Sequence, residues 1–128
     1  MKTRVLVIDD EIGWRDMFVF LLEPLGFEVT CAENGLEGVK RIREQEYHVV
    51  LMDVHMPILS GPEALKQIHE IRPDQKVIIF SSSSDPEHIL EKEAEVKSGV
   101  IACLYKPVEL AEIQRVLEKS LGTLPKTL

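Results

Sequence analysis

Short apolar segments alternate with longer segments of mixed polarity along the whole chain. Apolar or β-branched runs occur at residues 5–8, 27–31, 49–52, 77–80 and 100–104. Most of these runs are almost continuously apolar, which is typical of strands in a parallel sheet whose two faces are both covered. The run at 27–31 is more polar than the others, so we expect it at an edge of the sheet.

Segments of helical length lie between and after these runs. They cover residues 11–24, 34–45, 61–71, 86–98 and 107–121. Asn34, Ser60 and Ser84 each precede a glutamate by three residues, which is the pattern of a capping box at a helix start. Gly26, Gly99 and Gly122 stand where helices are expected to end.

Strict alternation of strands and helices predicts a single α/β domain, with helices on both faces of a parallel sheet and right-handed crossovers. Of the two common doubly wound orders, five strands and five flanking helices fit the flavodoxin-like order 2-1-3-4-5. This order places Cys31 and Cys103 on opposite edges, roughly 19 Å apart, which is too far for a disulfide. The domain is expected over residues 1–122, and residues 123–128 form a tail or a linker stub.

Composition narrows the classes of function. The chain has 128 residues, enough for one domain, and a net charge of −7, which disfavours direct binding to nucleic acid. No apolar stretch approaches the roughly 20 residues of a membrane-spanning helix. The amino terminus lacks the features of a secretory signal, and the cysteines have no metal-binding spacing. We therefore expect a cytoplasmic protein in a reducing compartment.

An acidic cluster is predicted at the carboxyl ends of two neighbouring strands. Asp9 and Asp10 follow the first apolar run, and Asp53 follows the third. In open α/β sheets, ligands bind at this edge, and crowded carboxylates need a neutralising cation. A site of few carboxylates and water suits Mg²⁺. The alternative is that the acids only cap the following helices, as Asp10 could for the first. The acidic loop disfavours a nucleotide or flavin site, which would need a phosphate-cradling loop.

Four segments together resemble the signature regions of a known family. They are residues 5–11, residues 49–57 with Gly61, residues 78–82 and residues 104–107. In this order they are similar to response-regulator receiver domains of the CheY-like superfamily, which serve bacterial two-component signal transduction. The resemblance extends from about residue 4 to residue 121 and implies the fold predicted above.

The resemblance implies a role for each acidic residue. Asp53 matches the phosphoacceptor and a ligand of Mg²⁺. Asp10 matches the acid that binds Mg²⁺ directly, and Asp9 matches the acid that usually acts through a water molecule. The backbone carbonyl of His55 matches a further metal ligand.

The resemblance also implies which groups contact the phosphoryl group. Ser81 matches the hydroxyl residue at the end of the fourth strand, and its spacing from Asp53 favours it over Ser82. Lys106 matches the lysine after the fifth strand, and its bond to Pro107 is expected to be cis. The loop after the fourth strand is expected to close when the phosphoryl group is present.

The implied function is a phosphorylation-activated switch rather than an enzyme, with only slow self-dephosphorylation. A histidine kinase or phosphotransfer protein would be the donor, and an effector protein or output domain the recipient of the signal. Phosphorylation-dependent homodimerisation through the fourth helix, fifth strand and fifth helix remains open. The donor, the output and the oligomeric state are not identified by the sequence.

Two other functions remain as alternatives. An aspartate-nucleophile phosphohydrolase would resemble Asp-x-Asp at the nucleophile, whereas this chain has His55 two residues after Asp53, and no insertion large enough to cover a substrate. A receiver-like module that binds partners without phosphorylation would tend to lose an acid or the lysine, and this chain keeps them all.

Three features depart from the family pattern. Cys103 replaces the aromatic residue three positions before Lys106, so we expect signalling through the loop after the fourth strand and the helix that follows. Extra residues fall within 85–98, forming either a solvated helix with a long lead-in loop or a specialised partner surface. His55 overhangs the site and could steer water in hydrolysis of the phosphoaspartate, whereas a phosphoryl relay through it is not expected.

Overall fold

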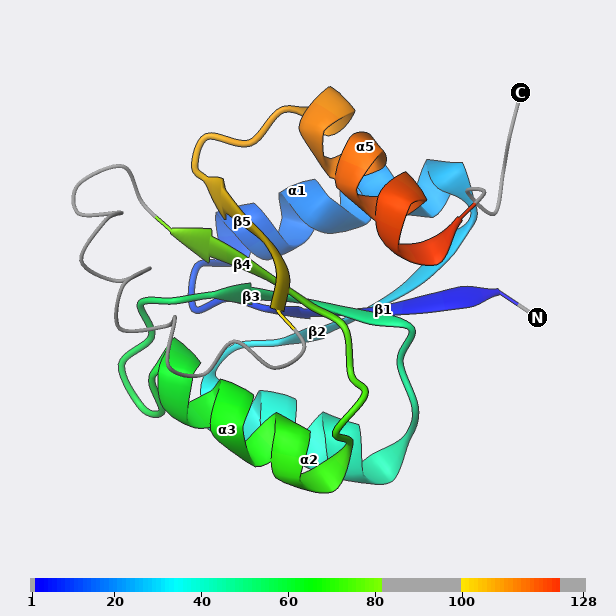
Figure 1. The fold of residues 1–128 in the computed structure, drawn as a ribbon. Coiled ribbons are helices and arrows are strands. Elements are labelled where there is room, and N and C mark those ends of the chain that lie inside the picture. Colours follow the sequence, from blue (N-terminus) through cyan, green and yellow to red (C-terminus); the bar gives the residue numbers. More distant parts are fainter. Residues whose placement is uncertain (1, 82–99, 123–128) are drawn as a thin grey trace.

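Five parallel strands form one sheet through the middle of the molecule (Figure 1). The structure, a computed structural model, describes residues 2–81 and 100–122. The strands are β1 (Thr3–Ile8), β2 (Phe27–Ala32), β3 (Val49–Asp53), β4 (Val77–Ser81) and β5 (Val100–Tyr105). Their order is β2-β1-β3-β4-β5, which confirms the predicted order and the edge position of β2.

Two pairs of described helices cover the two faces of this sheet. They are α1 (Ile12–Leu22), α2 (Gly35–Glu44), α3 (Gly61–Ile71) and α5 (Leu110–Leu121). Helices α1 and α5 lie on one face, and α2 and α3 lie on the other (Figure 1). The helix predicted over 86–98, the caps at Ser84 and Gly99, and the predicted tail lie outside the described residues.

The predicted caps of α2 and α3 form as side-chain hydrogen bonds. Asn34 Oδ1 accepts from the backbone N–H of Glu37 at 2.8 Å, and Ser60 Oγ accepts from that of Glu63 at 3.3 Å. These bonds satisfy backbone donors that have no partner within the helix. The local sequence therefore fixes where both helices begin.

The first and last helices are shorter than predicted. Helix α1 ends at Leu22, and a 3₁₀ turn, η1 (Glu23–Leu25), follows it. Pro24 lies in that turn and lacks the N–H that would continue the α-helix. Helix α5 begins at Leu110 rather than at 107, because Glu109 and Glu112 form a reciprocal capping box.

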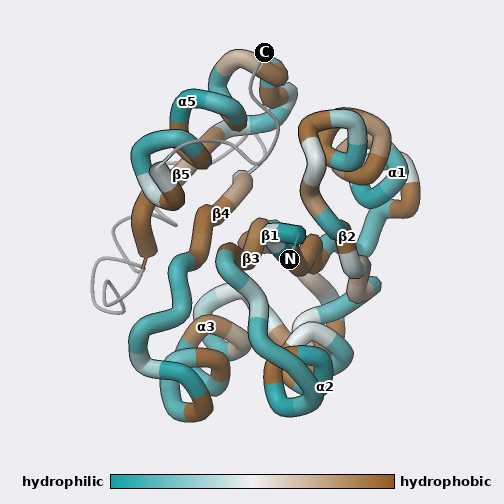
Figure 2. The backbone as a smooth tube through the Cα atoms, turned by 90° about the vertical axis from the view of Figure 1, so that its right-hand side faces the viewer, coloured by the Kyte–Doolittle hydropathy of each residue, from teal (hydrophilic) through white to brown (hydrophobic). Residues whose placement is uncertain are grey.

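Each face of the sheet has its own apolar core. Figure 2 shows the brown, hydrophobic strands β4 and β5 beside helices whose turns alternate between teal and brown. Leu65 and Ile68 of α3 pack on one face, and Phe18 and Leu22 of α1 pack on the other. Because both faces are covered, the central strands β1, β3 and β4 are almost wholly buried, as the continuous apolar runs predict.

The cysteines lie on the two edge strands as predicted. Cys31 is on β2 and Cys103 is on β5, and no disulfide joins them. Cys103 is half-buried against the core under α2 and α3. Among the described residues, no helix has both the length and the apolar character needed to cross a membrane.

Candidate functional site

Three carboxylates meet at the carboxyl edge of the sheet. Strands β1 and β3 are hydrogen-bonded neighbours, with Ile8 in register with Met52. Asp9 therefore lies beside Asp53, and Asp10 follows directly. One carboxylate oxygen of each acid lies within 4.8 Å of the others. The predicted cluster is present, and Asp9 and Asp53 in it are buried while Asp10 is exposed.

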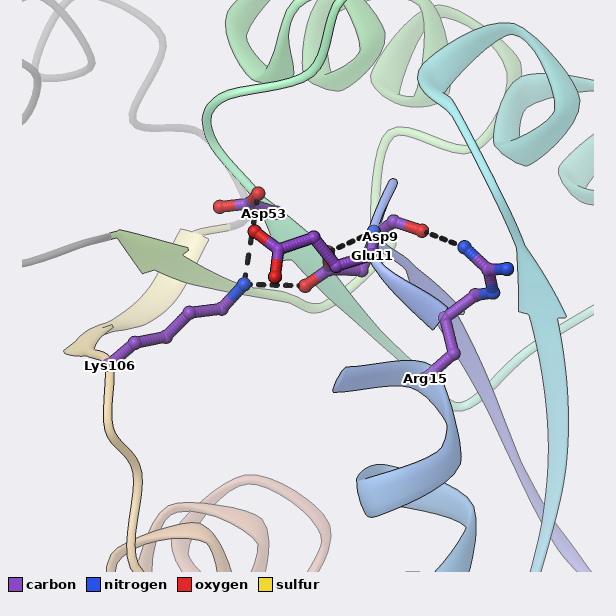
Figure 3. A network of polar contacts seen from close by, with 5 residues as sticks. All are labelled: Asp9, Glu11, Arg15, Asp53 and Lys106. Atoms are coloured by element: carbon purple, nitrogen blue, oxygen red, sulfur yellow. Dashed lines mark hydrogen bonds and ion pairs between the residues drawn. The ribbon is translucent and has the colours of Figure 1, made fainter. Parts of the chain in front are cut away.

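Three hydrogen bonds hold Asp9 in place, and those with Glu11 and Arg15 are drawn in Figure 3. The N–H of Asp9 donates to the carbonyl of Ala32 on β2 at 3.1 Å. Its Oδ1 accepts from the N–H of Glu11 at 3.0 Å, and its carbonyl accepts from Arg15 Nη1 at 2.7 Å. Arg15 is not among the site residues predicted from the sequence. Its position in the first turn of α1, beside an acidic loop, is the signal that could have found it.

The loop after β3 is fixed by a close approach of two backbone segments. The N–H of Gly61 donates to the carbonyl of Val54 at 3.0 Å. A Cβ at Gly61 would lie 2.8 Å from Val54 Cα and 2.9 Å from Val54 O, so only glycine fits. His55 lies in this loop with its side chain exposed, and its backbone N–H donates to the Asp53 carboxylate.

Lys106 reaches the acidic cluster from the other side of the site (Figure 3). Its Nζ lies 2.6 Å from Asp9 Oδ2 and 3.7 Å from Asp53 Oδ2, and the residue is 9% exposed. Its backbone N–H donates to the carbonyl of Ser81, the last residue of β4, at 2.8 Å. The Lys106–Pro107 peptide is cis, as the resemblance implied. Ser81 is 2% exposed.

Trp14 also contacts Lys106. The Nζ of Lys106 lies over its ring, 4.5 Å from the centroid. Trp14 is not among the site residues predicted from the sequence, because nothing in the pattern places the first turn of α1 against the segment that follows β5. This contact brings an uncharged group to an otherwise ionic site.

The surroundings of Asp53 disfavour its charged form. Burial raises the pKa of Asp53 to about 6 and is the largest influence on it. Lys106 lowers this pKa, Asp9 raises it, the hydrogen bond from His55 lowers it, and Asp10 raises it. The influences that raise this pKa outweigh those that lower it, as expected in a crowded acidic site. A further positive charge there would lower the pKa and favour the carboxylate form.

The donor set fits a small, hard divalent cation. The three carboxylates offer oxygen ligands, and Asp10 among them is exposed to solvent. Water can therefore reach the site, and Mg²⁺ usually retains several water ligands in proteins. The buried Asp53 carboxylate lies 3.7 Å from the Lys106 ammonium, an arrangement that can neutralise a transferring phosphoryl group.

Comparison with known protein families identifies the family of this chain. A family model described as the response regulator receiver domain matches residues 5–118. The chain belongs to this family. Receiver domains are regulatory phosphoacceptor domains, and this one is accordingly a phosphorylation-activated signalling switch of the two-component type.

Curated relatives include receiver domains that stand alone and receiver domains within longer regulators. The chemotaxis protein CheY of Thermotoga maritima is 32% identical over 120 residues, covering 93% of this chain and 98% of CheY. The transcriptional regulatory protein ZraR of Escherichia coli is 33% identical over 118 residues, covering 92% of this chain. The receiver domain spans only 26% of the length of that ZraR.

Solved receiver domains share the fold. A response regulator receiver domain protein from Clostridium thermocellum has a TM-score of 0.83 and 32% identity, with 94% of each chain covered. The receiver domain of the sensor histidine kinase PA1611 from Pseudomonas aeruginosa has a TM-score of 0.81 and 25% identity. The alignment covers 96% of this chain and 100% of the PA1611 receiver domain, whose structure has a magnesium ion coordinated in the active site cleft.

Proposed function

We propose that Asp53 is the phosphoacceptor of this receiver domain and that Mg²⁺ binds to the carboxylates of Asp9, Asp10 and Asp53 and to the backbone carbonyl of His55. The main support is the convergence of three carboxylate oxygens within 4.8 Å of one another beside a lysine ammonium. The magnesium ion in the PA1611 receiver domain is consistent with this assignment.

Transfer begins with an anionic nucleophile facing an anionic phosphoryl group. Bound Mg²⁺ would offset the repulsion between them and favour in-line geometry. A carboxylate oxygen of Asp53 forms a bond to phosphorus while the bond from phosphorus to the donor breaks. The donor leaves with the bonding electron pair, and the product is an acyl phosphate on Asp53.

Lys106 and Ser81 act on the phosphoryl oxygens. The Lys106 ammonium already lies 3.7 Å from the nucleophilic carboxylate, so a phosphoryl group on that carboxylate comes within its reach. The Ser81 hydroxyl is at the end of β4 and donates a hydrogen bond to a phosphoryl oxygen. The loop after β4, through which we expect the signal to reach a partner, lies outside the described residues.

The proposed partners follow from the domain's role. The donor is a histidine kinase or a phosphotransfer protein, and the recipient is an effector protein or an output domain. The length of ZraR fits a receiver joined to further domains, whereas that of CheY fits a receiver alone. We place the protein in the cytoplasm, and phosphorylation-dependent homodimerisation remains a second mode of output.

The test is incubation with acetyl phosphate and Mg²⁺ followed by intact-mass measurement. A single phosphoryl increment is expected in the wild type and none in Asp53→Asn. Asp74→Asn, which alters an exposed acid after α3, is the matched control and should behave as the wild type. An increment that persists in Asp53→Asn would contradict the assignment.

The same sample distinguishes a switch from a phosphohydrolase. A switch forms one phosphoaspartate per chain and releases phosphate only as that species decays. An enzyme would release phosphate steadily from a small phosphomonoester such as p-nitrophenyl phosphate. Steady release, abolished by Asp53→Asn, would favour the enzyme.

A further inference from the structure

We propose that Trp14 is a positioning residue for Lys106, and that its ring face holds the ammonium group where the phosphoryl oxygens arrive. The proposal rests on the proposed function, in which Lys106 contacts the phosphoryl group. It adds an element that the acidic cluster alone does not supply: a neutral surface that binds a cation.

The contact is close and partly shielded from solvent. The Nζ of Lys106 lies 4.5 Å from the centroid of the Trp14 ring, within the range of a cation–π interaction. Lys106 is 9% exposed and Trp14 is half-buried. Because little water screens the ammonium, attraction to the ring face is stronger than at an open surface.

The ring is itself held by a row of aromatic side chains. Trp14 and Phe18 are one turn apart on α1, with centroids 6.2 Å apart. Phe18 contacts Phe80 of β4 at 5.0 Å, and both are 1% exposed. The ring over Lys106 is therefore anchored in the core rather than free to turn outwards.

Lys106 needs such a support because the carboxylates that pair with its ammonium are also expected to bind Mg²⁺. Its ammonium lies 2.6 Å from Asp9 and 3.7 Å from Asp53, two of the three acids expected to bind Mg²⁺. A divalent cation shares these oxygens and repels the ammonium. The ring of Trp14 does not bind Mg²⁺, so it continues to hold a side chain that otherwise has a long, flexible stem.

The contact itself is tested by NMR without any phosphoryl donor. Protons over the face of an aromatic ring are shielded, so the Lys106 Cε methylene protons should resonate upfield in the wild type. The shift should persist when Mg²⁺ is added and vanish in Trp14→Leu. Unshifted Lys106 methylene protons in the wild type would overturn the proposal.

The positioning role is tested by the rate of phosphorylation from acetyl phosphate. Trp14→Leu should react roughly fivefold more slowly, and Trp14→Phe only about twofold more slowly, because phenylalanine keeps a weaker ring face. Phe20→Leu removes an exposed aromatic residue from the outward face of α1 and should react at the wild-type rate. Equal rates for Trp14→Leu and the wild type would overturn the proposal.

A double-mutant cycle separates positioning from general packing. In a Lys106→Met background, Trp14→Leu should cause no further loss, because the ring has no ammonium to hold. A further fivefold loss in that background would assign Trp14 to packing alone and overturn the proposal. If the wild type accepts no phosphoryl group, the proposed function is wrong. The contact between Trp14 and Lys106 is still tested in that case by the upfield shift of the Lys106 Cε methylene protons.

Discussion

The Nζ of Lys106 lies 2.6 Å from Oδ2 of Asp9, in a site where both side chains are almost fully buried. The ammonium thus neutralises part of the charge that a divalent cation would also neutralise. A bound metal and the lysine would therefore compete electrostatically for the same oxygens, although the proposed phosphorylation uses both.

Replacing Lys106 should strengthen metal binding while slowing phosphorylation. In Lys106→Met the acidic cluster loses a nearby positive charge, so we expect the dissociation constant for Mg²⁺ to fall about tenfold. Isothermal titration calorimetry measures the change. Lys66→Met removes an exposed lysine from α3 and serves as the control. Weaker Mg²⁺ binding in Lys106→Met would show that the ammonium supports the metal site rather than competing with it.

The raised pKa of Asp53 predicts a pH-dependent contribution to stability. With the pKa at about 6 in the folded protein, the protonated form is favoured by folding. The resulting stabilisation is fully present below about pH 4, the pKa of an unfolded-state aspartate, and is lost as the pH rises through 6. In metal-free protein, Asp53→Asn should therefore raise the free energy of unfolding at pH 7.5 by about 2 kcal/mol, but hardly at pH 4.

Urea denaturation in a chelator at these two pH values measures the effect. Asp74→Asn controls for replacing an acid by an amide at an exposed position. An Asp53→Asn protein that gains equally at both pH values would show that burial of the charge is not the cause.

Replacement by alanine is expected to change stability in opposite directions at two glycines, Gly61 and Gly13. Gly61→Ala places a Cβ 2.8 Å from the Val54 backbone, so the loop beside Asp53 must shift. We expect a loss of about 2 kcal/mol in stability and slower phosphorylation. At Gly13 in α1 a Cβ meets nothing within 4 Å, and Gly13→Ala should gain about 0.5–1 kcal/mol. Thermal unfolding measures both, and a tolerated Gly61→Ala would contradict the close approach.

The exposed side chain of His55 predicts a change in the lifetime of the phosphoaspartate. If the imidazole steers water towards the phosphoryl group, His55→Ala should lengthen that lifetime roughly threefold, far below the 10²–10⁴-fold effect of a well-positioned general base. The decay of the phosphoryl mass increment after removal of the donor measures it. His48 directly precedes β3, at the amino end of the strand that ends in Asp53, and His48→Ala is the control. An unchanged lifetime would dispose of this role.

The pattern of the sequence predicts features that depend on strand order. Continuous apolar runs require a sheet covered on both faces, and the order 2-1-3-4-5 places the ends of β1 and β3 side by side. The convergence of Asp9, Asp10 and Asp53 follows from that order alone. Signals at Asn34 and Ser60 are local, and they predict the starts of α2 and α3 correctly.

Contacts between distant segments are not contained in that pattern. The ring of Trp14 meets Lys106 because α1 packs beside the segment that follows β5, and neither residue alone indicates the other. Arg15 reaches the Asp9 carbonyl in the same way. The start of α5 was also predicted too early, because the glutamates at 109 and 112 cap the helix in place of the expected first turn.

Convergence of three carboxylates on one cation is most directly tested by calorimetric titration of the wild type, Asp10→Asn and Glu11→Gln with Mg²⁺. Glu11 is the matched control, since it carries an equal charge next to the cluster and its hydrogen bond to Asp9 comes from the backbone N–H, which the substitution keeps. One Mg²⁺ per wild-type chain is expected, with affinity at least tenfold weaker in Asp10→Asn and nearly unchanged in Glu11→Gln. No uptake by the wild type, or equal losses in the two variants, would contradict the site.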